Sequence, residues 1–140
     1  MRFLTAAILL MAIVSCATRP FTSQGNPTDA QLVTGIWKGV YTCAQGPTGL
    51  TLTLRGAADG LVEGDFLFYP TPSHPSAATG RFIVRGSYFS DGVLVLGGGA
   101  WIERPDNYLA VGLRGVVNGN AFTGVVPECG NSAFTLTRSG

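Results

Sequence analysis

Two carboxylates that share one predicted strand are the first candidates for chemistry. Glu63 and Asp65 are two residues apart, so in a strand they lie on the same face. Glycoside hydrolysis needs two carboxyl groups roughly 5–9.5 Å apart, and neighbours on one strand face meet that spacing. Every polar strand face also meets it, so the alternative is a solvated sheet surface.

The chain has one histidine, His74, which lies in a proline-rich segment between Ser73 and Ser76. A Ser-His-Asp hydrolase uses these residue types, but adjacency in sequence does not provide the geometry of a triad. The flanking prolines restrict the backbone and predict an exposed loop histidine. One histidine does not provide a ligand set for zinc or copper, so we expect no metal site and no cofactor.

The segment from residue 101 to residue 108 is the best candidate for a contact surface, because Trp, Tyr and Arg contribute most of the energy at recognition sites. Its expected binding residues are Trp101, Glu103, Arg104, Asp106 and Tyr108. The alternative is that the tryptophan closes the end of a barrel and the charged residues solvate a loop. If the segment is a contact surface, its expected partner is a protein or a glycan.

Nucleic acid is not an expected partner. The chain carries 9 Lys and Arg against 8 Asp and Glu, which gives a net charge of +1. The basic residues are dispersed along the sequence rather than grouped beside stacking aromatics.

The N-terminal residues predict export. Residues 3–14 are apolar except for one threonine and follow Arg2, a pattern that is too short for a stable membrane span and typical of a secretory signal. The segment Ile13-Val14-Ser15-Cys16 resembles a bacterial lipobox, which implies a signal peptide over residues 1–15 and a lipid on Cys16. Because Ala17 rather than Asp follows, the resemblance implies the periplasmic side of the outer membrane. The alternative is ordinary signal cleavage after Ala17 and a secreted protein.

Cysteine arithmetic agrees with lipidation. The sequence has 3 cysteines, an awkward number in an oxidising compartment because one thiol is left over. If Cys16 carries lipid, Cys43 and Cys129 remain as a disulfide pair. The alternative is two buried free thiols.

A change in the residue pattern divides the chain at residue 35. Residues 16–34 are mostly polar or small and predict a flexible tether between the lipidated N-terminus and the domain. From residue 35 to residue 140 apolar residues alternate with a period of two, as in half-buried strands. Gly, Asn and Asp pairs mark turns between the strands, and residues 108–117 read as one of them. We therefore expect one all-β domain, a small antiparallel barrel or sandwich of about eight strands with meander connections.

The mature domain resembles small β-barrel lipoproteins that inhibit C-type lysozymes. Members of that family have a Tyr-x-Cys segment early in the domain and a disulfide to a cysteine near its end. Tyr41-Thr42-Cys43 and Cys129 occupy comparable places in this sequence. The family inserts a Ser-Gly-x-x-Tyr motif into the lysozyme cleft, and the nearest segment here is Thr79-Gly80-Arg81-Phe82, which lacks both key residues. A second likeness, carried by Gly35-x-Trp37, is to avidin-type barrels.

The leading expectation is a non-catalytic envelope lipoprotein that acts as a binding or structural module. Its alternatives are a proteinaceous inhibitor of a cell-wall hydrolase, which would use Thr79, Arg81 and Phe82 or the segment 101–108, and a glycan-acting enzyme. A cavity lined by Trp37, Tyr41, Phe66 and Trp101 would favour a small ligand, whereas a solid interior would favour the loops.

Overall fold

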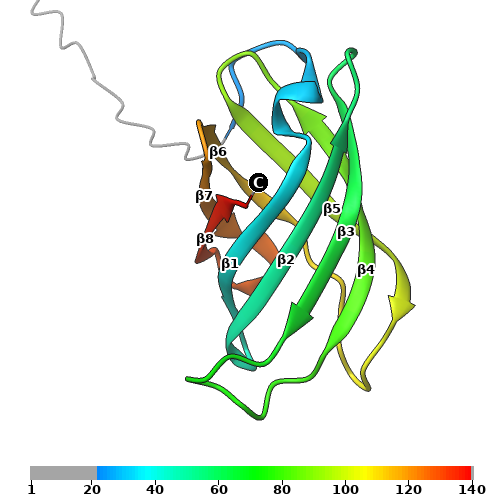
Figure 1. Cartoon of the computed structure of the whole chain (residues 1–140), viewed down its shortest axis with the longest axis vertical. Helices are drawn as coiled ribbons and strands as arrows, with labels where there is room; N and C mark the ends of the chain where they lie inside the picture. Colours follow the sequence, from blue (N-terminus) through cyan, green and yellow to red (C-terminus); the bar gives the residue numbers. More distant parts are fainter. Residues whose placement is uncertain (1–21, 140) are drawn as a thin grey trace, which may run out of the picture.

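A computed structural model of the chain describes residues 22–139. In these residues eight antiparallel strands form one closed barrel, in which each strand pairs with the next and the last pairs with the first (Figure 1). The predicted all-β meander is confirmed, and of the two expected architectures it is the barrel. The leader and Cys16 lie outside the described residues, so the lipobox stays a prediction.

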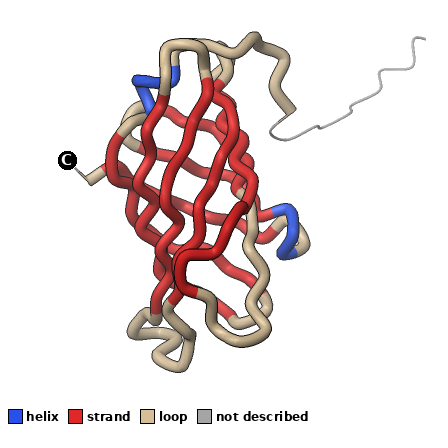
Figure 2. The backbone as a smooth tube through the Cα atoms, turned by 90° about the vertical axis from the view of Figure 1, so that its right-hand side faces the viewer, coloured by secondary structure: helices blue, strands red, loops and turns tan. Residues whose placement is uncertain are grey.

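The strands are long on one side of the barrel and short on the other. They are β1 (Gly35–Cys43), β2 (Gly46–Gly56), β3 (Leu61–Tyr69), β4 (Gly80–Tyr88), β5 (Val93–Glu103), β6 (Leu113–Asn118), β7 (Ala121–Val126) and β8 (Ser132–Arg138). Two 3-10 helices, η1 (Ala30–Val33) and η2 (Pro127–Cys129), interrupt the otherwise all-strand fold (Figure 2).

The period of two in the sequence decides which side chains enter the barrel. On β1 Trp37 and Tyr41 point inward and are almost fully buried, while Lys38 and Val40 face solvent. Leu50, Leu52 and Leu54 of β2 are buried in the same way. Burial of one such side chain stabilises the fold by about 1.5–3 kcal/mol, so the pattern fixes the register of the strands.

At one end the barrel is closed by η1 and the C-terminal strand. The indole of Trp37 donates a hydrogen bond to the carbonyl of Val33 at 3.0 Å, and the guanidinium of Arg138 lies 4.4 Å from the centre of the indole ring. Arg138 also donates to the carbonyls of Thr34 and Leu32 at 2.8 and 2.7 Å. The tryptophan and the arginine together hold η1 over this end, which we call the closed end.

The flexible tether expected before residue 35 is wrong for its described part, residues 22–34, because they are bound to the closed end. Ser23 and the backbone N–H of Gln24 donate to the carboxylate of Asp91 at 2.9 and 2.7 Å. Ala30 of η1 is completely buried. Its carbonyl lies where a Cβ on Gly56 would stand, so this contact requires the glycine. Tertiary contacts therefore order a segment that has no local period.

The strand predicted over residues 108–117 is also wrong in its first half. Residues 104–112 form a loop, and β6 begins only at Leu113. The chain before β6 packs against the bare backbone of β5, where a Cβ on Gly98 would stand 2.8 Å from the carbonyl oxygen of Val111. Apolar alternation in this loop reflects packing across the barrel end rather than strand pairing.

The longest loops lie at the end opposite η1, which we call the open end. The loops after β3 and β5 are at the bottom of Figure 1, and the strand directions place the β1–β2 turn and η2 at the same end. The functional candidates of the sequence belong mostly to these loops.

Candidate functional site

A pocket of about 530 Å³ lies at the open end. It is formed by the ends of β1, β3 and β4, the β1–β2 turn, the loop before β6, and η2. Its lining residues are Tyr41, Cys43, Ala44, Gln45, Phe68, Phe82, Asn107, Tyr108, Leu109, Val111, Glu128 and Cys129. The volume falls within the range of about 300–1,000 Å³ that is usual for small-molecule sites.

Aromatic rings form the floor and one wall of this pocket. Tyr108 stacks on Phe68 with ring centroids 5.4 Å apart and planes 7° apart. Trp101 meets Phe82 edge to face at 5.0 Å, and Phe82 stacks on Phe66 at 4.5 Å. Each pair contributes about 0.5–1.5 kcal/mol beyond its buried area, so the wall is held rigid without a ligand.

The interior is neither one open cavity nor solid throughout. Trp37 and Phe66 are fully buried in a packed interior, and Tyr41 and Phe82 mark the level at which the packing stops. Trp101 is half-buried against the aromatic wall. The barrel is solid at the closed end and hollow at the open end.

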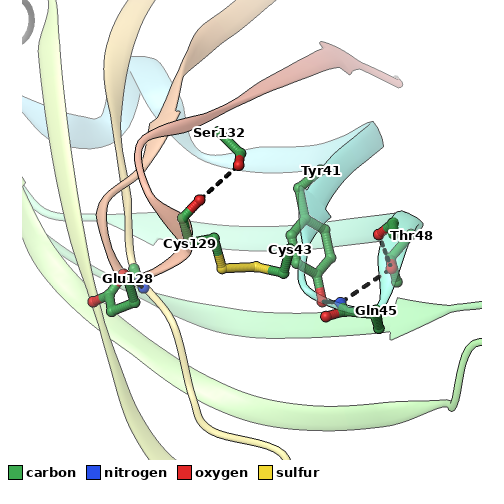
Figure 3. Close-up of a disulfide and its surroundings, with 9 residues drawn as sticks. Tyr41, Cys43, Gln45, Thr48, Glu128, Cys129 and Ser132 are labelled. Atoms are coloured by element: carbon green, nitrogen blue, oxygen red, sulfur yellow. Dashed lines mark hydrogen bonds between the residues drawn. A yellow bond between two sulfur atoms is a disulfide. The ribbon is translucent and has the colours of Figure 1, made fainter.

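A short polar chain reaches into the pocket beside the disulfide (Figure 3). The amide nitrogen of Gln45 donates to the hydroxyl of Tyr41 at 3.4 Å and to that of Thr48 at 3.1 Å. Burial raises the pKa of Tyr41, the nearby Tyr108 raises it further, and the hydrogen bond from Gln45 only partly offsets this. Tyr41 thus stays a neutral hydroxyl that can donate a hydrogen bond.

Cys43 and Cys129 form the predicted disulfide. Their Cα atoms are 5.0 Å apart, and the bond joins the end of β1 to η2 across 86 residues of sequence. Ser132 donates to the carbonyl of Cys129 at 2.6 Å and fixes the turn into β8. Both sulfur-bearing residues line the pocket, so the covalent bond is part of its rim.

Glu128 stands on the other side of the disulfide from Gln45 (Figure 3). Its Oε2 accepts a hydrogen bond from the backbone N–H of Gly112 at 3.0 Å, which ties η2 to the loop before β6. Pro127 before it and the disulfide-bonded Cys129 after it restrict its backbone. The carboxylate is therefore held at the rim by both covalent and hydrogen bonds.

The predicted contact segment 101–108 lies at the open end, but its residues have different positions. Tyr108 lines the pocket, and Trp101 supports the aromatic wall. Arg104 lies 5.7 Å from the indole centre and donates to the carbonyl of Tyr108 at 3.0 Å, so it stabilises the loop. Glu103 and Asp106 are exposed and lie outside the pocket lining.

The second predicted segment, Thr79 to Phe82, meets the first across the β4–β5 ladder. Phe82 pairs with Trp101, and Arg81 pairs with Glu103 on the outer surface. Phe82 points into the pocket, whereas Thr79 and Arg81 are exposed. The two segments were predicted as separate candidates, and the pairing of β4 with β5 makes them neighbours.

The other candidates for chemistry lie elsewhere. Glu63 and Asp65 are on the outer wall of β3, and Glu63 pairs with Arg85 at 3.7 Å. His74 was expected to be an exposed loop residue, but it is half-buried, because its ring packs over Gly46. A side chain on that glycine would stand 3.5 Å from the imidazole ring.

Sequence reasoning missed Gln45, Asn107, Leu109, Val111 and Glu128. Two of these residues could have been found from their position next to the predicted disulfide. Gln45 is two residues after Cys43 and Glu128 is next to Cys129, so the predicted disulfide already places both near one rim. Leu109 and Val111 belong to the loop that was interpreted as a strand, whereas Asn107 lies within the predicted contact segment 101–108 but was not named among its binding residues.

No protein-family model, curated protein or solved structure matches this chain. Within residues 22–139, no helix is long and apolar enough to cross a membrane. In the same part of the chain, no three His, Cys, Asp or Glu side chains are grouped so that they could hold a metal ion. What the open end offers is an aromatic pocket with one carboxylate and two amide side chains on its lining.

Proposed function

We propose that this chain is a non-catalytic lipoprotein of the bacterial cell envelope whose barrel binds a small, largely apolar molecule. The observation that supports this proposal is the pocket of about 530 Å³ at the open end, with its floor of aromatic rings. Sites of this kind combine an apolar lining with a few polar groups that orient the ligand. Here Tyr41, Gln45 and Asn107 are such groups.

The envelope location is supported by two features that are far apart in the sequence. A lipobox-like segment ends at Cys16, and the other two cysteines are close enough to form a disulfide. Structural disulfides persist in oxidising compartments such as the bacterial periplasm. The intact mass of the protein from a bacterial membrane fraction tests this part. We expect a chain that starts at Cys16 and carries lipid, and a full-length chain without lipid would contradict it.

Ligand binding can be tested with N-phenyl-1-naphthylamine, a neutral dye that fluoresces in apolar pockets. We expect the wild-type protein to bind this dye at one site. The variant Ala44→Trp places an indole at the rim, where Ala44 is exposed and lines the pocket, and should weaken dye binding at least tenfold. The matched control is Ala58→Trp, because Ala58 is an equally exposed alanine in the turn between β2 and β3 at the closed end.

The two variants distinguish dye binding in the pocket from dye binding elsewhere on the surface. Equal dye binding by both variants would show that the dye binds elsewhere, and no binding by the wild type would overturn the proposed function. Far-UV circular dichroism of each variant verifies that the barrel is intact.

Inhibition of a cell-wall hydrolase is a second candidate, favoured by the placement of both predicted contact segments at one end. Leu109 is 77% exposed and Ile102 is 48% exposed beside them, which is typical of a protein-binding rim. A pull-down with a C-type lysozyme and an activity panel of cell-wall hydrolases test this function. If it holds, Leu109→Asp should abolish binding, while Leu61→Asp, at a residue 59% exposed at the closed end, should not.

A further inference from the structure

The charge of the pocket lining is one-sided. Among the described residues that line the pocket, Glu128 is the one acidic residue. No lysine or arginine belongs to this lining. The hydroxyl of Tyr41 stays neutral because burial raises its pKa. Any charged group of a ligand that enters this pocket is therefore close to a negative side chain and not to a positive one.

The carboxylate of Glu128 has capacity for a ligand. One oxygen, Oε2, accepts the hydrogen bond from the N–H of Gly112 at 3.0 Å. In the described chain the second oxygen, Oε1, takes part in no hydrogen bond or ion pair. The disulfide at Cys129 fixes the backbone of η2, and the exposed side chain of Glu128 is among the residues that line the pocket.

Three arginines lie near the open end, Arg81, Arg104 and Arg114, and within residues 22–139 none of them forms an ion pair with Glu128. Arg104 stacks on Trp101 and donates to the carbonyl of Tyr108. Arg81 faces outward opposite Glu103 in the β4–β5 ladder. None of the three belongs to the pocket lining, so Glu128 is the charged side chain of that lining in the described part of the chain.

Four aromatic side chains add to this preference. Tyr41, Phe68, Phe82 and Tyr108 line the pocket together. The face of an aromatic ring carries partial negative charge and attracts an organic cation, most strongly where water is excluded. A carboxylate combined with aromatic walls is the chemistry that recognises alkylated ammonium groups.

We propose that the pocket selects an organic cation, namely an amine or quaternary ammonium group on a small apolar body. This inference rests on the proposed function and names the ligand class of the same site. The apolar body lies on Phe68 and Phe82, and the ammonium group faces Glu128. A fatty acid or another organic anion is disfavoured, because its charge would lie near the carboxylate.

Competition between ligands of equal shape tests the inference. Benzyltrimethylammonium, the neutral hydrocarbon neopentylbenzene and the anion phenylmethanesulfonate are each used to displace N-phenyl-1-naphthylamine from the wild-type protein. We expect the cation to displace the dye at a concentration at least tenfold below that of either of the others. Because the hydrocarbon is the most apolar of the three, this order cannot arise from hydrophobicity alone.

The variant Glu128→Gln assigns the preference to one side chain. Its amide oxygen can still accept the hydrogen bond from Gly112, so the rim should be retained while the charge is lost. We expect the ratio of cation to anion affinity to fall about tenfold. The matched control is Glu103→Gln, which removes the same charge from an exposed carboxylate outside the pocket and should leave the ratio unchanged.

The outcomes distinguish the inference from the proposed function. If the dye binds but the three competitors displace it equally, or if Glu128→Gln leaves the ratio unchanged, the cation preference is overturned and the pocket remains a binding site. If the wild type does not bind the dye, both are overturned.

Discussion

Where the chain enters the barrel, η1, Trp37 and Arg138 fill the interior, whereas at the opposite end the packing stops at Tyr41 and leaves a pocket. The closed end is held by hydrogen bonds and by stacking of the guanidinium on the indole. The open end is held by a disulfide and by the hydrogen bond between Glu128 and Gly112. The same eight strands thus enclose a packed core at one end and a pocket at the other.

This contrast shows how a small barrel combines stability with a site. The interior of an eight-stranded barrel is just wide enough to be filled by side chains, so a cavity must be created by leaving part of it unfilled. Hydrophobic burial at the closed end supplies the stability that the unfilled open end lacks. A covalent bond at the open end holds its loops where the core is thinnest.

The largest effect is expected from the tryptophan of the closed end, with the tryptophan of the open end as its comparison. Trp37→Ala removes a fully buried ring and should lower the free energy of unfolding by about 3–5 kcal/mol. Trp101→Ala, at a half-exposed residue of the open end, should lower it by about 1–2 kcal/mol. Urea unfolding followed by far-UV circular dichroism measures both. Equal losses would mean that the two ends do not differ in packing.

The disulfide is expected to have the next largest effect. Replacing Cys43 and Cys129 together by alanine should lower the free energy of unfolding by about 2–4 kcal/mol, because the bond closes a long loop. It should also weaken binding of N-phenyl-1-naphthylamine several-fold, since both residues line the pocket. Urea unfolding and dye titration are the two measurements.

Reduced wild-type protein is the control for this double variant, because it loses the bond and keeps both sulfur atoms. If dye affinity falls in the variant but not after reduction, the lost sulfur atoms rather than the lost bond change the pocket. Unchanged stability in both samples would show that the disulfide does not stabilise the open end.

The smallest effect is local and depends on pH. Desolvation raises the pKa of Asp91, but hydrogen bonds from Gln24, Ser23 and Val93 outweigh it and lower the pKa below its usual value of 3.8. A lowered pKa in the folded state means that the carboxylate stabilises the fold above about pH 4 and loses this effect as the pH falls through the folded value. We expect residues 22–28 to lose protection from amide hydrogen exchange when the pH falls from about 6 to about 2.

The control for this pH effect is Asp91→Asn, in which the same residues should be poorly protected at both pH values. The Cys43–Cys129 end contains no part of this network and should keep its protection in both proteins. Simultaneous loss at both ends would indicate global acid unfolding rather than release of the N-terminal segment.

Several features of the fold and the site could be predicted before the structure. The period of two placed Trp37 and Tyr41 inside the barrel, and the count of cysteines paired Cys43 with Cys129. Tyr108 and Phe82, two of the predicted binding residues, line the pocket at the open end. The order of residues 22–34 and the loop before β6 could not be predicted, because their contacts are with the closed end and with β5 and leave no local period.

The sequence by itself determined the strands, their inward faces and the sulfur pair, because strand alternation and turn chemistry are local and depend on residues one or two apart. Only the tertiary structure decided that the barrel is filled at one end and hollow at the other. Gln45 and Glu128 share a rim because β1 pairs with β8, which brings together loops that are more than eighty residues apart. Closure of the barrel is a long-range event, and no short window of sequence contains it.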